Sequence, residues 1–201
     1  MPAVGEIRRV LAGKLGRVLT PEDAAEIEAA IFASPDLSHD PASFGQLRID
    51  GYTIQAERLG DILGEIHQLH VEHWAETEKH RHGLKLNLDY DSMLARERAG
   101  NLIQFTIRTD SGELVGNLRM VIATSTHTQT RYACEDTLFI RPAHRGGTKV
   151  MALMRFAERA MLGLGIREGR ASSKLVNRAD VLMRRMGYEP VALEFVKILK
   201  D

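Results

Sequence analysis

Residues 134–165 read CEDTLFIRPAHRGGTKVMALMRFAERAMLGLG, and the order of elements in this stretch decides the fold. Apolar residues up to Ile140 predict a strand, Pro142 ends it, and apolar residues at helical spacing predict a helix from about Thr148 to Leu164. A glycine-containing turn joins the two. Because the N–H groups of such a turn and the positive end of the helix dipole point at one spot, the stretch predicts an anion pocket. A ligand that contains phosphate is the first that this pattern indicates.

The segments on either side of this stretch predict a sheet. Residues 46–57 alternate apolar and polar side chains around Asp50-Gly51, and a second pair of such runs flanks Asp110-Ser111-Gly112. The predicted elements, in chain order, are a hairpin at 46–57, helices at 59–74 and 91–98, strands at 102–107, 114–122 and 132–140, a helix at 148–164, a short strand at 166–172, a helix at 177–186 and a last strand at 191–199. We therefore predict an α/β fold, with a mixed, mostly antiparallel sheet and helices on both faces.

The N-terminal segment has a different pattern. Residues 1–33 predict two short helices, the second of which begins at Thr20-Pro21-Glu22-Asp23 with an N-cap, a first-position proline and acidic first-turn residues. Residues 34–45 (SPDLSHDPASFG) contain two prolines and several small polar residues, which is typical of a linker. We expect a helical N-terminal extension and linker at 1–45, followed by the main domain at 46–201.

The composition limits the classes of partner. The chain has 201 residues, its 27 Lys and Arg balance 27 Asp and Glu, and its sequence pI is about 7.1. This balance gives no net attraction to nucleic acid or to a membrane surface, so neither is expected as the main partner. The single cysteine, Cys134, excludes an internal disulfide, and we find no apolar run typical of a membrane span or a secretory leader. We expect a cytoplasmic protein.

Residues 138–147, LFIRPAHRGG, resemble a motif of the GNAT N-acetyltransferase superfamily, and most of all its phage and prophage subgroup. Members of this subgroup tend to have the pattern D-x-L-hydrophobic-x-x-P-x-x-R-G-G before a helix that reads like LRFAE. Asp136-Thr137-Leu138 and Met154–Glu158 (MRFAE) stand at those places. Three further segments resemble the superfamily in the expected order, namely His73–Glu76 (HWAE), Asp110–Gly116 (DSGELVG) and Asn177–Tyr188 (NRADVLMRRMGY). The resemblance extends over roughly residues 50–199.

The resemblance implies that acetyl-CoA is the co-substrate and that its acetyl group goes to an amine. The turn would bind the pyrophosphate with N–H groups, positive charge and the helix dipole, through Arg145, Gly146, Gly147, Thr148, Lys149 and Val150. The strand end at Leu138, Phe139 and Ile140 would leave a backbone N–H for the thioester carbonyl, where it stabilises the tetrahedral oxyanion. Asn177 would bind the pantetheine arm, cap its own helix, or do both. No metal is expected.

Two positions depart from the pattern of the superfamily. Its pyrophosphate signature is usually R-x-x-G-x-G or R-x-x-G-x-A, whereas Thr148 and Val150 stand here where small residues are expected. Many members also have, in the helix that begins at Asn177, a tyrosine that protonates the leaving thiolate, and Met183 stands at the corresponding place. Tyr188 either packs at the end of that helix or supplies the acid that Met183 cannot.

An ammonium group must lose a proton before it attacks, so a base is expected near the thioester. Glu135 and Asp136 lie just upstream on the same predicted strand, and we favour Glu135 as the base over Asp136. Adjacent residues of a strand point to opposite faces, so only one of the two faces a given cleft unless a bulge intervenes. The alternative is that one or both are structural carboxylates, bonded to backbone or arginine.

Five histidines between residues 67 and 82 and the lone cysteine give rival interpretations. His67, His70 and His73 step by three, with His80 and His82 after them, so a metal cluster is one hypothesis. Steps of three rotate by about 60° each around a helix, which makes one shared ion awkward. We expect instead that His70 and His73 pack on the sheet or line the acceptor cleft. His127 could reach the acceptor site, but we expect it in a solvated loop. Cys134 could carry the acyl group as a thioester, but we expect it to be a small core residue.

The sequence favours direct acetyl transfer from acetyl-CoA to an amine of a small-molecule or peptide acceptor. One alternative is a catalytically weak or inactive binding or assembly protein of phage or prophage origin, to which residues 1–45 would give a virion or host partner. A second is an acyltransferase with a longer acyl donor. The acceptor, the role of residues 1–45 and the oligomeric state, with a homodimer among the options, are left open.

Overall fold

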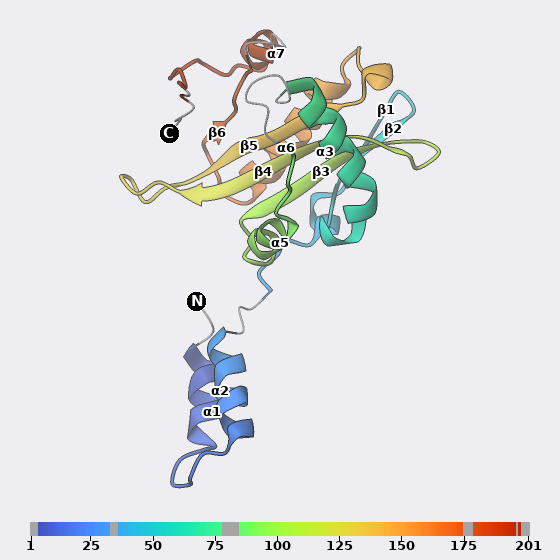
Figure 1. Ribbon diagram of the computed structural model, residues 1–201. Coiled ribbons are helices and arrows are strands. Elements are labelled where there is room, and N and C mark those ends of the chain that lie inside the picture. The colour runs from blue at the N-terminus through green and yellow to red at the C-terminus, as the bar shows by residue number, and fades with distance from the viewer. Residues whose placement is uncertain (1–3, 33–35, 78–84, 175–178, 196, 198–201) are drawn as a thin grey trace.

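The computed structural model describes residues 4–32, 36–77, 85–174, 179–195 and 197. Its centre is a six-stranded sheet with the strands in chain order (Figure 1). The strands are β1 Gln46–Ile49, β2 Tyr52–Glu57, β3 Leu102–Thr109, β4 Leu114–Thr124, β5 Arg131–Ile140 and β6 Gly169–Arg170. Neighbours from β1 to β5 are antiparallel and β6 is parallel to β5, so the predicted mixed, mostly antiparallel sheet is confirmed.

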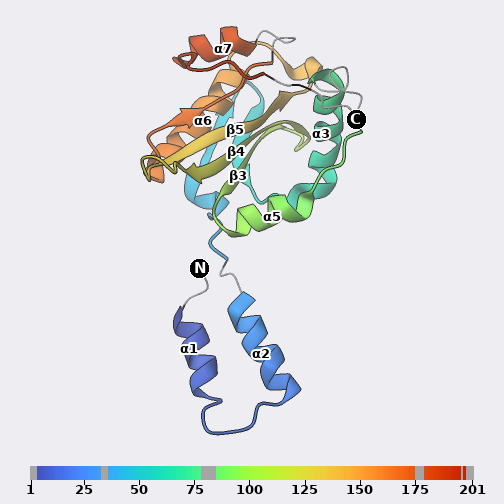
Figure 2. The ribbon, with the colours of Figure 1, turned by 60° about the vertical axis from the view of Figure 1, so that its left-hand side comes forward.

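Helices cover both faces of the sheet. Helix α3 (Leu63–Thr77) and helix α5 (Tyr90–Arg98) lie on one face, and helix α6 (Lys149–Gly163) lies on the other (Figure 2). The short helix α7 (Ala179–Arg185) follows β6. No helix in the described ranges is long and apolar enough to cross a bilayer.

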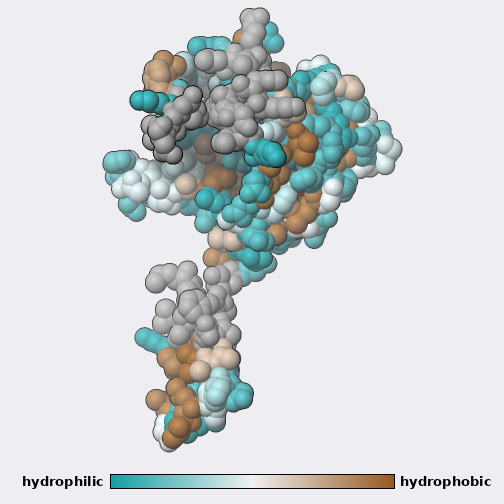
Figure 3. Space-filling view, viewed as in Figure 1, coloured by the Kyte–Doolittle hydropathy of each residue, from teal (hydrophilic) through white to brown (hydrophobic). Residues whose placement is uncertain are grey.

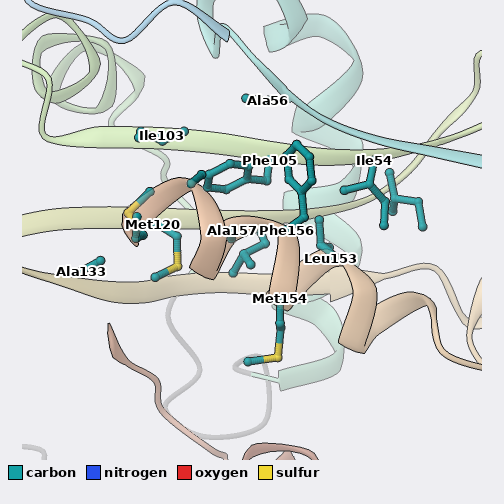
Figure 4. Packing of buried hydrophobic residues seen from close by; sticks show 14 of the residues in the cluster. Ile54, Ala56, Ile103, Phe105, Met120, Ala133, Leu153, Met154, Phe156 and Ala157 are labelled. Carbon is teal, nitrogen blue, oxygen red and sulfur yellow. The ribbon is translucent and has the colours of Figure 1, made fainter. Parts of the chain in front are cut away.

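Two apolar layers hold these helices on the sheet. The larger lies under α6, where Phe105 and Leu118 of the strands meet Leu153 and Phe156 of the helix (Figure 4). The smaller lies under α3 and includes Leu69. The two layers follow from the alternation of side chains along each strand, which sends successive residues to opposite faces.

The face under α3 also contains a buried polar row. Gln104 of β3, Arg119 of β4 and Thr137 of β5 are cross-strand partners, and each is at most 5% exposed. Buried polar groups are costly unless they are bonded, so the hydrogen-bond partners of this row matter to the stability of this face.

Helices α1 (Val4–Ala12) and α2 (Pro21–Phe32) lie side by side, away from the sheet, in both views (Figures 1 and 2). The N–H of Asp23 donates to Thr20 Oγ1, and the N–H of Thr20 donates to Asp23 Oδ2, so the expected cap of the second helix is confirmed. Apolar side chains stand in solvent at the closed end of this hairpin, where Leu15 is 82% and Val18 91% exposed (Figure 3). The division of the chain at residue 45 stays a prediction.

The last predicted strand is the main error. Residues 191–195 are described and lie outside the sheet, with Val191, Leu193 and Phe195 exposed by 94%, 81% and 88%. A segment with apolar alternation forms a strand only where a neighbouring strand offers an edge of similar length. Strand β6 is two residues long and offers too short an edge. The helix predicted from residue 59 also begins later, at Leu63, because a short 3₁₀ turn at Gly60–Ile62 precedes it.

Candidate active site

A β-bulge lies at the two predicted acidic residues. Arg119 of β4 pairs with Thr137, and the next residue, Met120, pairs with Glu135, so Asp136 is an extra residue in β5. A bulge changes the direction of a side chain and bends its strand. It separates the partners of the two carboxylates: Asp136 binds Arg119, whereas Glu135 accepts hydrogen bonds from Ser172.

Strands β5 and β6 separate at the same point. Their pairing consists of Ala133 with Gly169 and Cys134 with Arg170. The N–H of Ser172 still donates to Glu135 Oε2 at 3.2 Å. Beyond this residue, no strand among the described residues pairs with this edge of β5. Part of the backbone N–H groups of β5 therefore face an open edge, where they are available to a ligand. The predicted residues Leu138, Phe139 and Ile140 form the last part of this edge.

The turn after β5 leads into the N-terminus of α6. Gly146 and Gly147 have φ angles of 108° and 60°, which side chains other than glycine rarely adopt. A Cβ atom at either position would meet no atom within 4 Å, so the turn is open to the outside. The first-turn N–H groups of a helix have no acceptor within the helix, and Thr148 gives them no side-chain cap. The turn thus has the backbone donors expected of an anion site.

The two cations predicted to bind the pyrophosphate, Arg145 and Lys149, have protein partners. Arg145 donates from Nε to the carbonyl of Ile140 at 2.7 Å and from Nη2 to Glu76 at 2.6 Å, and its guanidinium lies over the Phe139 ring. The ammonium of Lys149 lies 4.9 Å from the centre of the Tyr52 ring. Backbone groups of the turn are therefore the better-placed donors for an anion. The half-buried Val150 packs against the core under α6.

Similar solved structures share this arrangement of strands and helices. An aminoglycoside acetyltransferase from an uncultured soil metagenomic sample has a TM-score of 0.60 and 14% identity, over 75% of this chain and 97% of its own. A ribosomal-protein-alanine N-acetyltransferase from Brucella melitensis biovar Abortus 2308 has a TM-score of 0.58 and 16% identity, over 75% of this chain and 100% of its own.

The name of a third similar structure indicates another class of acceptor, an amino sugar phosphate. Glucosamine-6-phosphate N-acetyltransferase from Arabidopsis thaliana has a TM-score of 0.59 and 9% identity, over 75% of this chain and 100% of its own. The chain has the GNAT fold. No protein-family model and no curated protein matches the sequence, so the closeness to the phage and prophage subgroup stays a prediction.

Within this GNAT fold, Glu135 stands where the two strands separate. Burial raises the pKa of its carboxyl above the usual range, and the neighbouring charge of Asp136 adds to this effect. A carboxylate with a raised pKa is a stronger base than an ordinary one, so the structure is consistent with the expected role of Glu135. Burial and the two adjacent carboxylates also raise the pKa of Cys134, which keeps that residue a thiol.

Tyr188 brings a hydroxyl group to the same separation. A Cβ atom at Gly169 would lie 3.4 Å from Tyr188 Oη, which places the phenol against β6. Burial raises the pKa of Tyr188, as do the carboxylates of Glu158 and Glu135. Met183, which stands where many members of the superfamily have a tyrosine, is buried in the core. Tyr188 is thus a phenol beside β6 that could serve as the acid, and Tyr132 of β5, whose ring contacts Arg170 of β6, is another tyrosine at this pairing.

The histidines of α3 have other partners than a metal. His70 is buried and its ring stacks on Tyr90, and the His73 ring lies 5.5 Å from that of Phe139, so the expected packing on the sheet is confirmed. In the ranges that the structure describes, no three His, Cys, Asp or Glu residues come together as metal ligands would. His80, His82 and the predicted ligand-binding residue Asn177 lie outside the described residues.

The sequence pattern does not single out Arg119. Its Nε donates to Asp136 Oδ2 at 2.6 Å and its Nη2 donates to Thr137 Oγ1 at 2.9 Å, so it binds both residues at the bulge. The only signal in the sequence is an arginine within the apolar run 114–123, LVGNLRMVIA, at a position that alternation assigns to one face. A surface arginine on a solvated face gives the same signal.

Proposed function

We propose that this protein transfers an acetyl group from acetyl-CoA directly to an amine. One observation supports this most strongly. The single strand β5 has two carboxylates at a bulge, an edge left open by β6, and a glycine turn that ends at a helix N-terminus. Acyl transfer from a CoA thioester needs a base, oxyanion donors and a pyrophosphate site, and this strand presents a group for each.

The residues fit the co-substrate. The open space over Gly146 and Gly147 would admit a pyrophosphate, and the N–H groups of the first turn of α6 would bind it. Acetyl-CoA supplies the acetyl group as an activated thioester. The open N–H groups of β5 would hold the thioester oxygen and stabilise the negative charge that develops on it.

The remaining groups would move protons. Glu135 would accept the proton of the attacking ammonium, because burial makes its carboxylate more basic than usual. Tyr188 carries its proton at neutral pH, as a phenol does, and it would donate that proton to the leaving thiolate, although its raised pKa makes it a weaker acid than an ordinary tyrosine. Asp136 is held by Arg119 and is second choice as the base.

A transfer assay with several classes of amine tests the proposal. The names of the similar structures indicate three classes to include: an aminoglycoside, a peptide with an N-terminal alanine, and glucosamine 6-phosphate. Free CoA thiol is measured with and without each amine. We expect thiol release that depends on the amine and is lost in Glu135→Gln. A chain that shows no stabilisation by acetyl-CoA in a thermal-shift titration contradicts the proposal, because binding to the native state must raise stability.

The second candidate function is a GNAT-fold protein of phage or prophage origin that binds and assembles without turnover. The exposed apolar side chains at the closed end of the hairpin of α1 and α2 favour it, since such patches mark interaction sites. Stabilisation by acetyl-CoA without transfer to any amine would support this candidate. Competition by thioesters of increasing acyl length tests the acyltransferase with a longer donor.

A further inference from the structure

Arg119 is a charged side chain inside the protein. Its side chain is 6% exposed, and it lies in the middle of β4 under α3. A buried guanidinium is stable only when its donors have acceptors. Two acceptors lie on β5, Asp136 Oδ2 and Thr137 Oγ1, and two lie on the helices, His70 Nε2 of α3 and Met93 Sδ of α5, at 3.3 and 3.2 Å from Nη1.

The hydrogen bonds of this group have a fixed direction. A guanidinium only donates, so His70 Nε2 must accept and the proton of this ring must be on Nδ1. His70 Nδ1 lies 3.0 Å from Tyr90 Oη, which therefore accepts from it and donates its own proton to His67 Nδ1 at 3.2 Å. The bonds run from Arg119 of β4 through His70 of α3 and Tyr90 of α5, and end at His67 of α3.

The electrostatics agree with this direction. Burial, and next the charge of Arg119, lowers the pKa of His70 to about 3, so that the ring stays neutral at physiological pH. A neutral ring can accept at Nε2, whereas a protonated ring would repel the guanidinium. Helices α3 and α5 thus bind Arg119 on the side away from β5, and the neutral His70 accepts one of its hydrogen bonds.

On the side of Arg119 that faces β5, the guanidinium binds the two residues at the bulge. Its two acceptors there are consecutive residues, Asp136 as the extra residue and Thr137 as the first one back in register. A shift of one residue in β5 would exchange the faces of Glu135 and its neighbours. An arginine that binds these two side chains fixes the residue at which the strand bulges.

We propose that Arg119 is a positioning residue for acetyl transfer. By clamping Asp136 and Thr137 it sets the place of the bulge, and so the positions of the Glu135 carboxylate and of the open N–H edge at residues 138–140. Arg119 touches neither substrate in this account and acts through β5. The inference rests on the proposed function for its catalytic part, and on β5 alone for its structural part.

The test compares Arg119→Lys with Arg108→Lys. Arg108 lies on the same face in β3 and binds Glu57 and Glu65 with its fork, so its replacement removes a comparable arginine away from the bulge. We expect Arg119→Lys to lower kcat at least ~10-fold while the Kd for acetyl-CoA changes less than ~3-fold, because misplaced groups slow the reaction more than they weaken remote binding. Arg108→Lys should leave kcat within ~3-fold of the parent.

A second measurement does not need activity. Amide hydrogen exchange of the full chain should be faster at residues 135–138 in Arg119→Lys than in the parent, and unchanged there in Arg108→Lys. Equal exchange rates at residues 135–138 in all three proteins would overturn the proposal that Arg119 fixes the bulge. An unchanged kcat in a folded Arg119→Lys would overturn the proposal that Arg119 positions groups for acetyl transfer. If the parent binds acetyl-CoA but transfers to no amine, the proposed function has failed, and the exchange data alone decide whether Arg119 fixes the bulge.

Discussion

The Nε of Arg119 donates to Oδ2 of Asp136 at 2.6 Å, across the point at which β5 has one residue more than β4. The two side chains differ in surroundings, since that of Arg119 is 6% exposed and that of Asp136 is 47% exposed. The pair therefore connects the buried interior under α3 with the part of β5 that no longer pairs with β6.

Replacement of Asp136 should destabilise the fold. Asp136→Ala leaves the buried Arg119 without its charged partner, which costs 3–5 kcal/mol in a fully buried pair. Because Asp136 is half exposed, we expect a loss of about 2 kcal/mol in the free energy of unfolding. Urea unfolding measures it, with Glu168→Ala as control, since the exposed Glu168–Arg170 pair should contribute less than about 1 kcal/mol. Equal losses in both variants would show that the Arg119–Asp136 pair contributes no more to the free energy of unfolding than an exposed ion pair does.

Glu135→Gln should reduce turnover and leave acetyl-CoA binding intact. A positioned general base typically contributes 10²–10⁴-fold, so we expect kcat to fall by at least about 100-fold. Since the pKa of Glu135 is raised, kcat/KM of the parent should fall as the pH drops through a value above the usual carboxyl pKa. The measurement is a pH–rate profile of the parent, Glu135→Gln and Asp136→Asn. Parent-like turnover in both variants removes the assignment of the base to this pair.

Tyr188→Phe should lower kcat with little effect on the binding of either substrate. The phenol lies against Gly169 of β6, beside the last residues that pair with β5, and removal of one positioned acid typically costs 10²-fold or more. Steady-state kinetics measures the change, and urea unfolding shows whether packing is kept. A variant with normal kcat would leave Tyr188 with a packing role only.

His70 should make stability depend on pH. Its pKa is about 3 in the folded protein and ordinarily 6.5, so the unfolded chain binds more protons between these values, and stability falls as the pH falls below 6.5. From pH 7 to pH 5 this histidine should remove about 2 kcal/mol from the free energy of unfolding. Urea unfolding of the parent and His70→Gln measures this, because glutamine does not titrate and can still accept from Arg119. His127→Gln in an exposed loop is the control, and identical pH slopes in all three proteins would contradict the neutral buried ring.

Most elements were predictable because their signals are local. The Asp50-Gly51 turn has both residues at positive φ, as its hairpin requires, and the helix after the glycine turn begins at Lys149, one residue from the predicted start. The position of Glu135 and Asp136 on the strand before this turn was likewise readable from the sequence.

What the sequence could not predict depends on partners distant in the chain. The bulge at Asp136 is a property of the register between β4 and β5, and the partners of Arg119 come from β5, α3 and α5. The contact of Arg145 with Glu76 joins residues 69 positions apart, so a cation expected to face the ligand is held elsewhere. The strand expected at 191–199 fails in its described part for the same reason, since alternation does not reveal whether an edge exists.

Acetyl transfer by this protein depends on the turn after β5, which should bind the pyrophosphate of acetyl-CoA. Isothermal titration of acetyl-CoA into the parent, Gly147→Asp and Gly112→Asp measures this binding. Both glycines are exposed and have positive φ, at 60° and 88°, so the two variants suffer similar backbone strain. Only the first places a carboxylate at the N-terminus of α6. We predict saturable binding in the parent and in Gly112→Asp and at least a ~10-fold weaker affinity in Gly147→Asp, since one repelled charge costs more than a unit of log K at close range. Equal affinity in all three proteins, or no binding to the parent, would contradict the account.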